Sequence, residues 1–184
     1  MTVTKSPTSG TTQSKPRVMG IDVGTAITGW SIIEKDPHAN NGMKLVNYGA
    51  ILTQAGEKMP ARLEKLYSEL SQLMDLYQPQ EIAIESLFFF KNQTTVMTVS
   101  QARGVILLAA QMHKLSIFEY TPLQVKQAVT GFGRAEKAQV QNMVKMIMGM
   151  TEIPKPDDAA DAIAIGICQI QTASFMDKVN KAKQ

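Results

Sequence analysis

The stretch VMGIDVGTAITGWSII, residues 18–33, decides the fold. Residues 18–22 are apolar and end in an acid, and residues 29–33 are apolar again, so each half predicts a β-strand. Gly24 lies between them and predicts a turn, because glycine adopts backbone conformations that other residues avoid. The stretch therefore predicts two adjacent antiparallel strands, with Asp22 at the end of the first.

The segments that follow extend this pair into a sheet. Turn-forming residues at 36–42 and an apolar run at 45–53 predict a third antiparallel strand. Leucines at steps of three and four predict a helix from Pro60 to Tyr77, and EIAIE at 81–85 predicts a strand after it. A strand that follows a helix in this way is typical of a parallel βαβ unit.

The rest of the chain continues with helices and one more strand. We expect a strand at 117–120 and helices at 93–114, 122–130, 134–149 and 158–173. Three antiparallel strands followed by alternating helices and strands are typical of the RNase H-like fold. The predicted fold class is therefore α/β, with a mixed five-stranded sheet flanked by helices.

Length and composition indicate one folded domain. The chain has 184 residues, and the 44% that are hydrophobic allow a substantial core. The single cysteine, Cys168, excludes an internal disulfide and fits a reducing compartment, so we expect a cytoplasmic protein. No apolar run approaches the ~20 residues of a membrane span, so we expect no membrane partner.

The first 16 residues are rich in Ser, Thr, Lys and Pro, and they predict a disordered tail because they cannot bury apolar surface. An organelle transit peptide is the alternative, but the segment is poor in arginine and shows no amphipathic pattern. We therefore expect a disordered tail at 1–16, one folded domain at 17–174 and a polar C-terminal tail at 175–184.

The net charge of +3 is unevenly distributed along the chain. Residues 86–155 carry eight basic side chains against three acids. Such a segment can present a basic face to phosphates. Charge alone favours the alternative, a solvated surface with scattered lysines.

Four carboxylates stand out against their apolar surroundings. Asp22 and Glu85 end apolar strands, where an unpaired charge is costly to bury. Asp158 and Asp161 are three residues apart and share one face of a predicted helix, whose apolar continuation should pack on the sheet. Four oxygen donors without a His or Cys cluster favour Mg²⁺, with Mn²⁺ able to substitute. Together they predict a site for paired divalent ions.

Each acid also has an ordinary structural interpretation. Asp158 on its own fits a helix N-cap, and Asp157 fits that role equally well and is left outside the predicted site. Asp22 on its own fits a turn. The interpretation as a metal site depends on the joint occurrence of the acids at two strand ends and one helix.

Five sequence blocks resemble the RuvC family in order and spacing. The resemblance covers residues 18–173, and two of its blocks, GFGRAEK and DAADAIAI, are specific. The chain departs from the family's first motif at two positions. Val23 stands where the family usually has proline, and Ser31, a small residue before the apolar run, stands where the motif has glycine or alanine. The matching blocks are GIDVGTAITGW (20–30), AIESLFFFKNQTT (83–95), SQARGVILLAA (100–110), PLQVKQAVTGFGRAEKAQVQ (122–141) and DDAADAIAIGIC (157–168).

The resemblance implies an endonuclease that resolves four-way Holliday junctions in homologous recombination and DNA repair. It implies Mg²⁺-dependent hydrolysis with two metal ions, and Asp22, Glu85, Asp158 and Asp161 match the catalytic, metal-binding acids. The position of Asp158 varies between Asp and His in the family, so its role is the least defined. The implied DNA-binding residues are Phe88, Lys91, Lys126, Arg134 and Lys137, with Phe88 stacking at the crossover and Lys126 and Lys137 near the scissile phosphate.

The resemblance also implies partners. Members of the family are homodimers, and the helix at 93–114 is our interface candidate because of its apolar face (Val96, Val99, Val105, Ile106, Ala109 and Ala110). A branch-migration complex of the RuvA/RuvB type is a further implied partner, together with four-way junction DNA.

Two other classes of function remain open at this point. GIDVGT also resembles the phosphate loop of actin-like ATPases and sugar kinases, but the chain is short for their two domains and lacks their second glycine-rich motif. A related nuclease acting on structured RNA, or a non-catalytic DNA-binding relative, would keep the same fold. The presence of all four acids favours catalysis.

Overall fold

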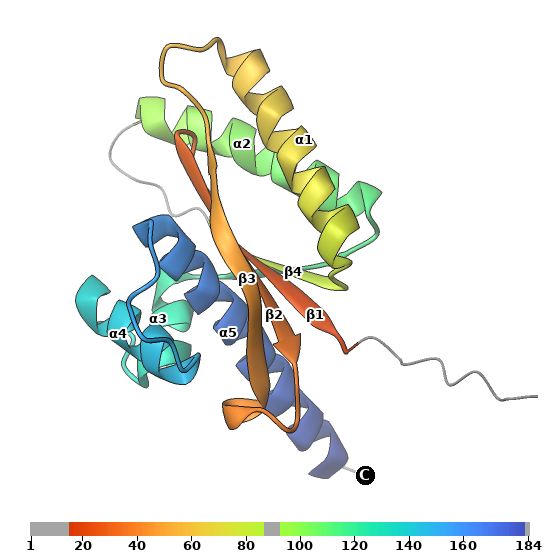
Figure 1. Ribbon diagram of the computed structural model, residues 1–184, viewed down its shortest axis with the longest axis vertical. Helices are drawn as coiled ribbons and strands as arrows, with labels where there is room; N and C mark the ends of the chain where they lie inside the picture. The colour runs from red at the N-terminus through yellow and green to blue at the C-terminus, as the bar shows by residue number, and fades with distance from the viewer. Residues whose placement is uncertain (1–14, 87–92, 183–184) are drawn as a thin grey trace, which may run out of the picture.

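The computed structural model describes residues 15–86 and 93–182, and its middle layer is a five-stranded sheet in the order β3-β2-β1-β4-β5 (Figure 1). The first three strands are antiparallel neighbours, whereas β1 pairs with β4 and β4 with β5 in parallel. The expected mixed sheet is therefore confirmed. The strands are β1 (Arg17–Asp22), β2 (Ile27–Lys35), β3 (Met43–Leu52), β4 (Glu81–Glu85) and β5 (Ser116–Tyr120).

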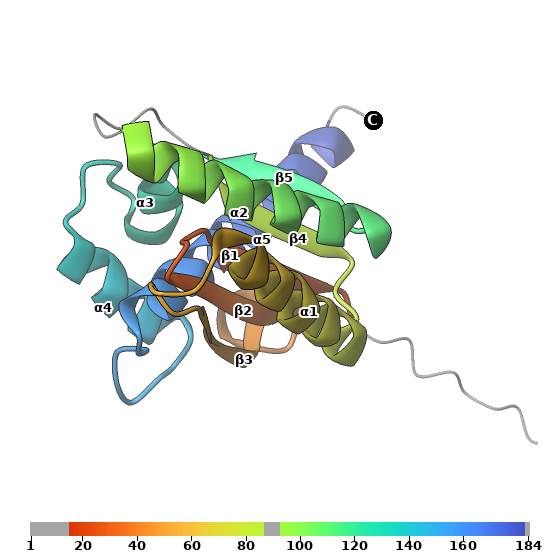
Figure 2. The same ribbon diagram turned by 90° about the horizontal axis from the view of Figure 1, so that it is seen from above.

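Helices cover both faces of this sheet. Two of them, α1 and α2, lie on one face, and α3, α4 and α5 lie on the other (Figures 1 and 2). The helices are α1 (Met59–Tyr77), α2 (Gln93–Met112), α3 (Pro122–Thr130), α4 (Lys137–Ile147) and α5 (Asp157–Ala182), with a short 3-10 turn, η1 (Asn40–Gly42), between β2 and β3.

Side chains point alternately to the two faces of the sheet along each strand, so each face has its own hydrophobic core. In β1 the side chains of Met19 and Ile21 pack toward α1 and α2, whereas Val18 packs toward α5. Successive strand residues point to opposite faces, so a strand covered on both sides is apolar throughout. Gly20 and Asp22 share the face of Val18, and Asp22 therefore ends β1 on the side of α5.

Helix α5 packs closely on the sheet because glycines face it. A β-carbon at Gly20 would lie 2.2 Å from the carbonyl oxygen of Ala162, and one at Gly29 would lie 2.0 Å from that of Asp158. The buried Ser31 hydroxyl donates a hydrogen bond of 2.9 Å to the same Ala162 carbonyl. The sequence of β1 and β2 thus fixes where the first turns of α5 lie.

Helix α5 is the central helix of the domain. By length and composition it could cross a membrane, but its stretch from Ala159 to Ile170 is buried against the sheet and its neighbouring helices. Burial inside the domain accounts for its apolar composition.

Two predicted helix boundaries were wrong, and the other elements agree within about two residues. The helix expected from Arg134 begins at Lys137, because a turn closed by the bond from Ala135 N to Phe132 O precedes it and Glu136 is its N-cap. The helix expected to end near Ala173 continues to Ala182. Its last turns carry the polar residues that had suggested an end to the regular structure.

Candidate active site

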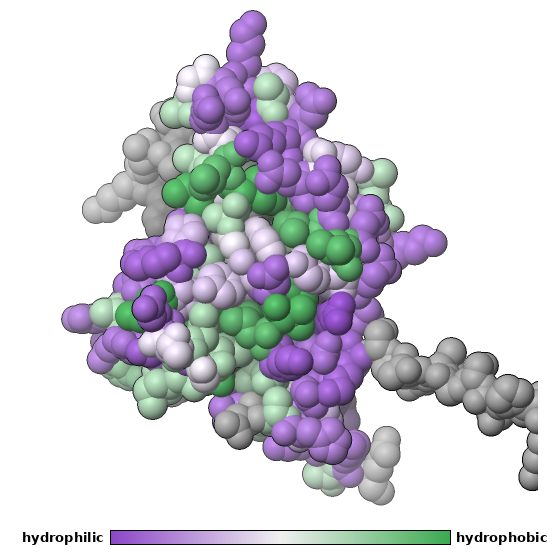
Figure 3. All heavy atoms as spheres, viewed as in Figure 1, coloured by the Kyte–Doolittle hydropathy of each residue, from purple (hydrophilic) through white to green (hydrophobic). Residues whose placement is uncertain are grey.

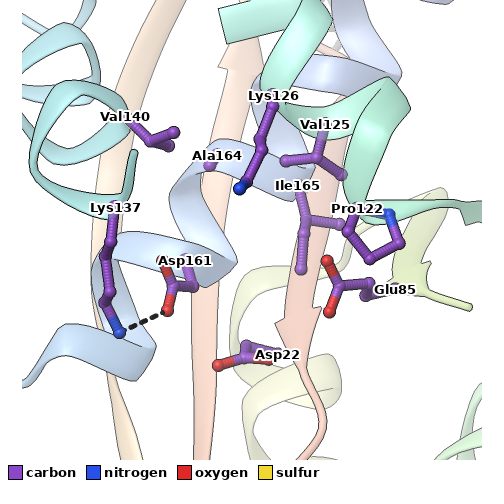
Figure 4. A pocket seen from close by; sticks show the side chains of 10 residues that line it. All are labelled: Asp22, Glu85, Pro122, Val125, Lys126, Lys137, Val140, Asp161, Ala164 and Ile165. Atoms are coloured by element: carbon purple, nitrogen blue, oxygen red, sulfur yellow. Dashed lines mark ion pairs between the residues drawn. The ribbon is translucent and has the colours of Figure 1, made fainter. Parts of the chain in front are cut away.

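Three of the four predicted acids line one pocket. Asp22, Glu85 and Asp161 lie around a pocket of about 250 Å³, together with Lys126 and Lys137 (Figure 4). The remaining lining is mostly apolar and comes from α3, α4 and α5: Pro122, Val125, Val140, Ala164 and Ile165. The pocket thus combines converging carboxylates and two lysines with an apolar wall.

The two strand acids meet because their strands are parallel neighbours. The register pairs Ile21 with Ile84, so Asp22 and Glu85, each one residue further, end adjacent strands at the same edge. Ligands in open α/β sheets commonly bind at this edge, outside the carboxyl ends of the strands. Asp161 reaches the same point from the second turn of α5, which the close packing on Gly20 and Gly29 holds there.

The carboxylates of the pocket raise one another's pKa values, because their negative charges repel. Burial raises the pKa of Asp22, and the neighbouring acids Asp161, Glu85 and Asp158 add to this effect; against an opposing effect of Lys137, the pKa reaches about 7. Burial, followed by the charge of Asp161, also raises the pKa of Glu85, while Lys126 lowers it. A cation bound between these groups would relieve both the burial cost and the repulsion.

Lys137 forms an ion pair with one acid of this cluster. Its ammonium is 3.0 Å from Asp161 Oδ2 and 3.7 Å from Asp157 Oδ2. Burial acts to lower the pKa of Lys137, but the hydrogen bond and charge of Asp161 outweigh it and the pKa is raised. The lysine therefore carries its full charge beside Asp161 at neutral pH.

The donor set suits a hard divalent ion, although the acids are not yet arranged around one. Within residues 15–86 and 93–182, no three His, Cys, Asp or Glu side chains are grouped closely enough to hold a metal ion. All the available donors are carboxylate oxygens, which magnesium and manganese prefer. A metal ion there would draw these carboxylates together and would compete with Lys137 for Asp161.

Asp158, the fourth predicted acid, lies beside the pocket rather than in its lining. Its charge contributes to the raised pKa of Asp22, and its carbonyl oxygen lies over Gly29. Helix α5 begins at Asp157, so Asp157 and Asp158 occupy its first turn, where carboxylates interact favourably with the helix dipole. Neither residue is the N-cap that the alternative interpretation required.

The predicted DNA-binding residues fall into three groups. Lys126 and Lys137 line the pocket. Arg134 is exposed in the turn before α4 and does not line it. Phe88 and Lys91 lie outside the described residues.

Sequence reasoning missed one residue at the site and misjudged one helix face. Asp157 was left outside the site and does not line the pocket, but its carboxylate contacts Lys137, a contact that the sequence did not predict. Its place in the first turn of α5, next to Asp158, was the available signal. On α2, Ile106, Ala109 and Ala110 pack inside this chain's own core and cannot form an interface. The helical period could not distinguish a core-facing stripe from a partner-facing one.

The chain is similar to proteins of one family along most of its length. The family profile described as "Crossover junction endodeoxyribonuclease RuvC" matches residues 18–169. The protein of that description from Caldicellulosiruptor saccharolyticus is 52% identical over 160 residues, which cover 86% of this chain and 94% of that protein. The one from Finegoldia magna is 51% identical over 159 residues, covering 86% and 95%.

Solved structures with the same fold include RuvC from Thermus thermophilus. It superimposes with a TM-score of 0.80 at 29% identity, over 86% of this chain and 96% of that one. The same protein in complex with a Holliday junction substrate gives a TM-score of 0.78 at 28% identity, over 87% and 96%.

Proposed function

The chain belongs to the RuvC family of crossover junction endodeoxyribonucleases, and we propose that Asp22, Glu85, Asp158 and Asp161 carry out its hydrolysis of DNA. It is an endonuclease that resolves Holliday junctions in recombination and repair. The observation that best supports the assignment of these residues is the pocket in which carboxylates from β1, β4 and α5 converge.

The chemistry that we propose is hydrolysis of symmetric phosphodiesters with two bound Mg²⁺ ions. Asp22, Glu85 and Asp161 would hold the ions, and Asp158 would join them from the first turn of α5. Bound there, divalent ions supply a water of lowered pKa for attack and positive charge for the leaving oxygen. The raised pKa values of Asp22 and Glu85 support this role, because carboxylates that repel one another favour a cation between them.

The two lysines of the pocket have a separate role in this proposal. Lys126 and Lys137 would bind the scissile phosphate, since both line the pocket and can neutralise phosphate oxygens. Arg134 and Lys91 would bind the DNA backbone as well. Phe88 would stack on an unpaired base there, a contact worth about 1–3 kcal/mol.

Helix α2 remains our candidate for the interface of a homodimer. Met97, Leu108 and Met112 are exposed on it, at spacings that place them along one side of the helix. A twofold dimer would present two active sites to the two symmetric strands of a junction. We further propose a cytoplasmic protein that acts with a RuvA/RuvB-type complex, and a polar tail at residues 1–16 that precedes the nuclease domain. The polar segment expected as a tail at 175–184 is helical as far as Ala182 and belongs to α5.

The experiment that tests this proposal uses purified full-length protein, Mg²⁺ and labelled substrates. We expect paired symmetric nicks in a synthetic four-way junction and little cleavage of linear duplex or structured RNA. Asp22→Asn, or chelation of the metal, should abolish cleavage without abolishing junction binding. Full activity of Asp22→Asn would refute the metal site, preferred cleavage of RNA would favour an RNA-processing relative, and binding without cleavage would favour a non-catalytic one.

A further inference from the structure

Lys137 joins two carboxylates on the neighbouring helix. It is the first residue of α4, and its ammonium lies 3.0 Å from Asp161 Oδ2 and 3.7 Å from Asp157 Oδ2. The two acids lie one turn apart at the start of α5, so they are on the same side of that helix. Figure 4 shows the Lys137–Asp161 pair beside Asp22 in the pocket.

This ion pair conflicts with the role proposed for Asp161. An ammonium and a divalent ion at one carboxylate repel each other at short range, and each neutralises charge that would attract the other. Lys137 therefore competes with a metal ion for Asp161, and its departure would strengthen metal binding there. This step rests on the proposed function, since it takes Asp161 to be a metal ligand.

Lys137 also contacts Asp157, a carboxylate to which no role has yet been assigned. Its Oδ1 accepts a hydrogen bond from Lys155 at 2.7 Å, while its Oδ2 faces Lys137. One oxygen is thus held by a neighbouring lysine, and the other is oriented toward the ammonium of Lys137. The side chain of Lys137 is 55% exposed, which leaves it room to turn from one acid to the other.

We propose that Asp157 is a positioning residue that receives the ammonium of Lys137 when Asp161 binds a divalent cation. The exchange releases Asp161 for the metal and keeps Lys137 at the edge of the pocket, where a DNA phosphate can reach it. Lys137 is then a built-in competitor of the metal, and Asp157 reduces that competition.

A simpler effect has the same sign and must be separated from this one. The negative charge of Asp157 attracts any cation nearby, so its removal weakens metal binding even when Lys137 does not move. The exchange requires Lys137, whereas the direct charge effect does not. A double-mutant cycle between Asp157 and Lys137 therefore distinguishes them.

The test measures Mn²⁺ binding to the full-length protein without DNA, from the electron paramagnetic resonance signal of free Mn²⁺. We expect Asp157→Asn to weaken binding about threefold to tenfold, as a coupling of this kind implies. Lys137→Met should bind Mn²⁺ more tightly than the wild type, and adding Asp157→Asn to it should change binding by less than about twofold. Glu152→Gln, an exposed acid in the loop before α5, is the matched control and should stay within about twofold of the wild type.

Cleavage provides a second readout that a purely structural role would not give. In Asp157→Asn, the Mg²⁺ concentration for half-maximal junction cleavage should rise by the same factor, while the rate at saturating Mg²⁺ stays within about twofold. A lower maximal rate with an unchanged Mg²⁺ requirement would overturn the exchange.

The binding data separate the failure of this inference from that of the proposed function. If Asp157→Asn weakens Mn²⁺ binding by the same factor in the wild type and in Lys137→Met, the exchange is refuted and the metal site stands. If Asp161→Asn binds Mn²⁺ as well as the wild type, Asp161 is not a ligand, and both proposals fail.

Discussion

Replacing Asp22 by Asn should stabilise the metal-free protein at alkaline pH while it abolishes cleavage. The pKa of Asp22 is about 7 in the folded chain against 3.8 as its ordinary value, chiefly because of burial and then of the neighbouring acids. Each pKa unit corresponds to ~1.4 kcal/mol, so the ionised carboxylate destabilises the fold by at most about 4 kcal/mol above pH 7. Asparagine has nearly the same shape and carries no charge.

The sign of the pH dependence follows from proton linkage. Between pH 4 and 7 the folded chain keeps a proton on Asp22 that the unfolded chain has lost, so the wild type loses stability as the pH rises through this window. From pH 5 to pH 8 the loss amounts to about 3 kcal/mol. Asp22→Asn should not show this loss, and its stability relative to the wild type should rise by a similar amount.

Urea unfolding in the presence of a chelator measures this difference at pH 5 and pH 8. Asp177→Asn is a suitable control, because Asp177 is exposed near the end of α5 and far along the helix from the pocket. Added Mg²⁺ should stabilise the wild type and the control at pH 8 but have little effect on Asp22→Asn. If the difference in stability between Asp22→Asn and the wild type is the same at both pH values, the raised pKa inferred for Asp22 is refuted.

Three further substitutions test how the fold positions the site. Gly29→Ala should reduce both cleavage and the stabilisation by Mg²⁺, because its β-carbon would meet the Asp158 carbonyl, whereas Gly56→Ala, with open space around it, should behave as the wild type. Tyr120→Phe should lower the free energy of unfolding by about 1–3 kcal/mol in urea titrations, since the buried Gln169 loses the hydroxyl bonded to it. Thr121→Ala should cost about 1 kcal/mol by the same measurement, because Thr121 closes a capping box with Gln124 at the start of α3; unchanged stability would contradict that role.

The sequence was sufficient to predict most of the fold, because its periodic signals are local. Strand β4 and helix α3 were predicted to the residue, since a short apolar run and a proline-led helix mark their own ends. The start of α4 was wrong because the turn before it is closed by a bond from Ala135 to Phe132, and helix-forming residues occupy that turn. The C-terminal extension of α5 was missed because the polarity of its last turns resembles that of a tail.

The convergence of Asp22, Glu85 and Asp161 on one pocket was predictable, whereas the contacts around them were not. Asp22 and Glu85 could be placed at strand ends from apolar flanks alone, and the parallel register then made them neighbours. The block DAADAIAI distinguishes Asp158 from Asp157 by its match to the family, but only the position of α5 shows that Asp157 faces Lys137. The hydrophobic pattern of α2 likewise could not show that Ile106 faces the chain's own core.

Packing and catalysis in this domain share one interface, between α5 and the first two strands. The carbonyl oxygen of Asp158 lies against Gly29 and that of Ala162 against Gly20, each too close to leave room for a β-carbon. The Ser31 hydroxyl donates a hydrogen bond to the Ala162 carbonyl. Any larger side chain at these glycines must displace the turn that carries Asp158 and Asp161. A displacement of only about 1 Å is enough to cost a nuclease much of its rate, because the proposed metal ligands come from both sides of this interface. Substitutions at these positions should therefore impair cleavage before they unfold the chain, although all three residues are buried.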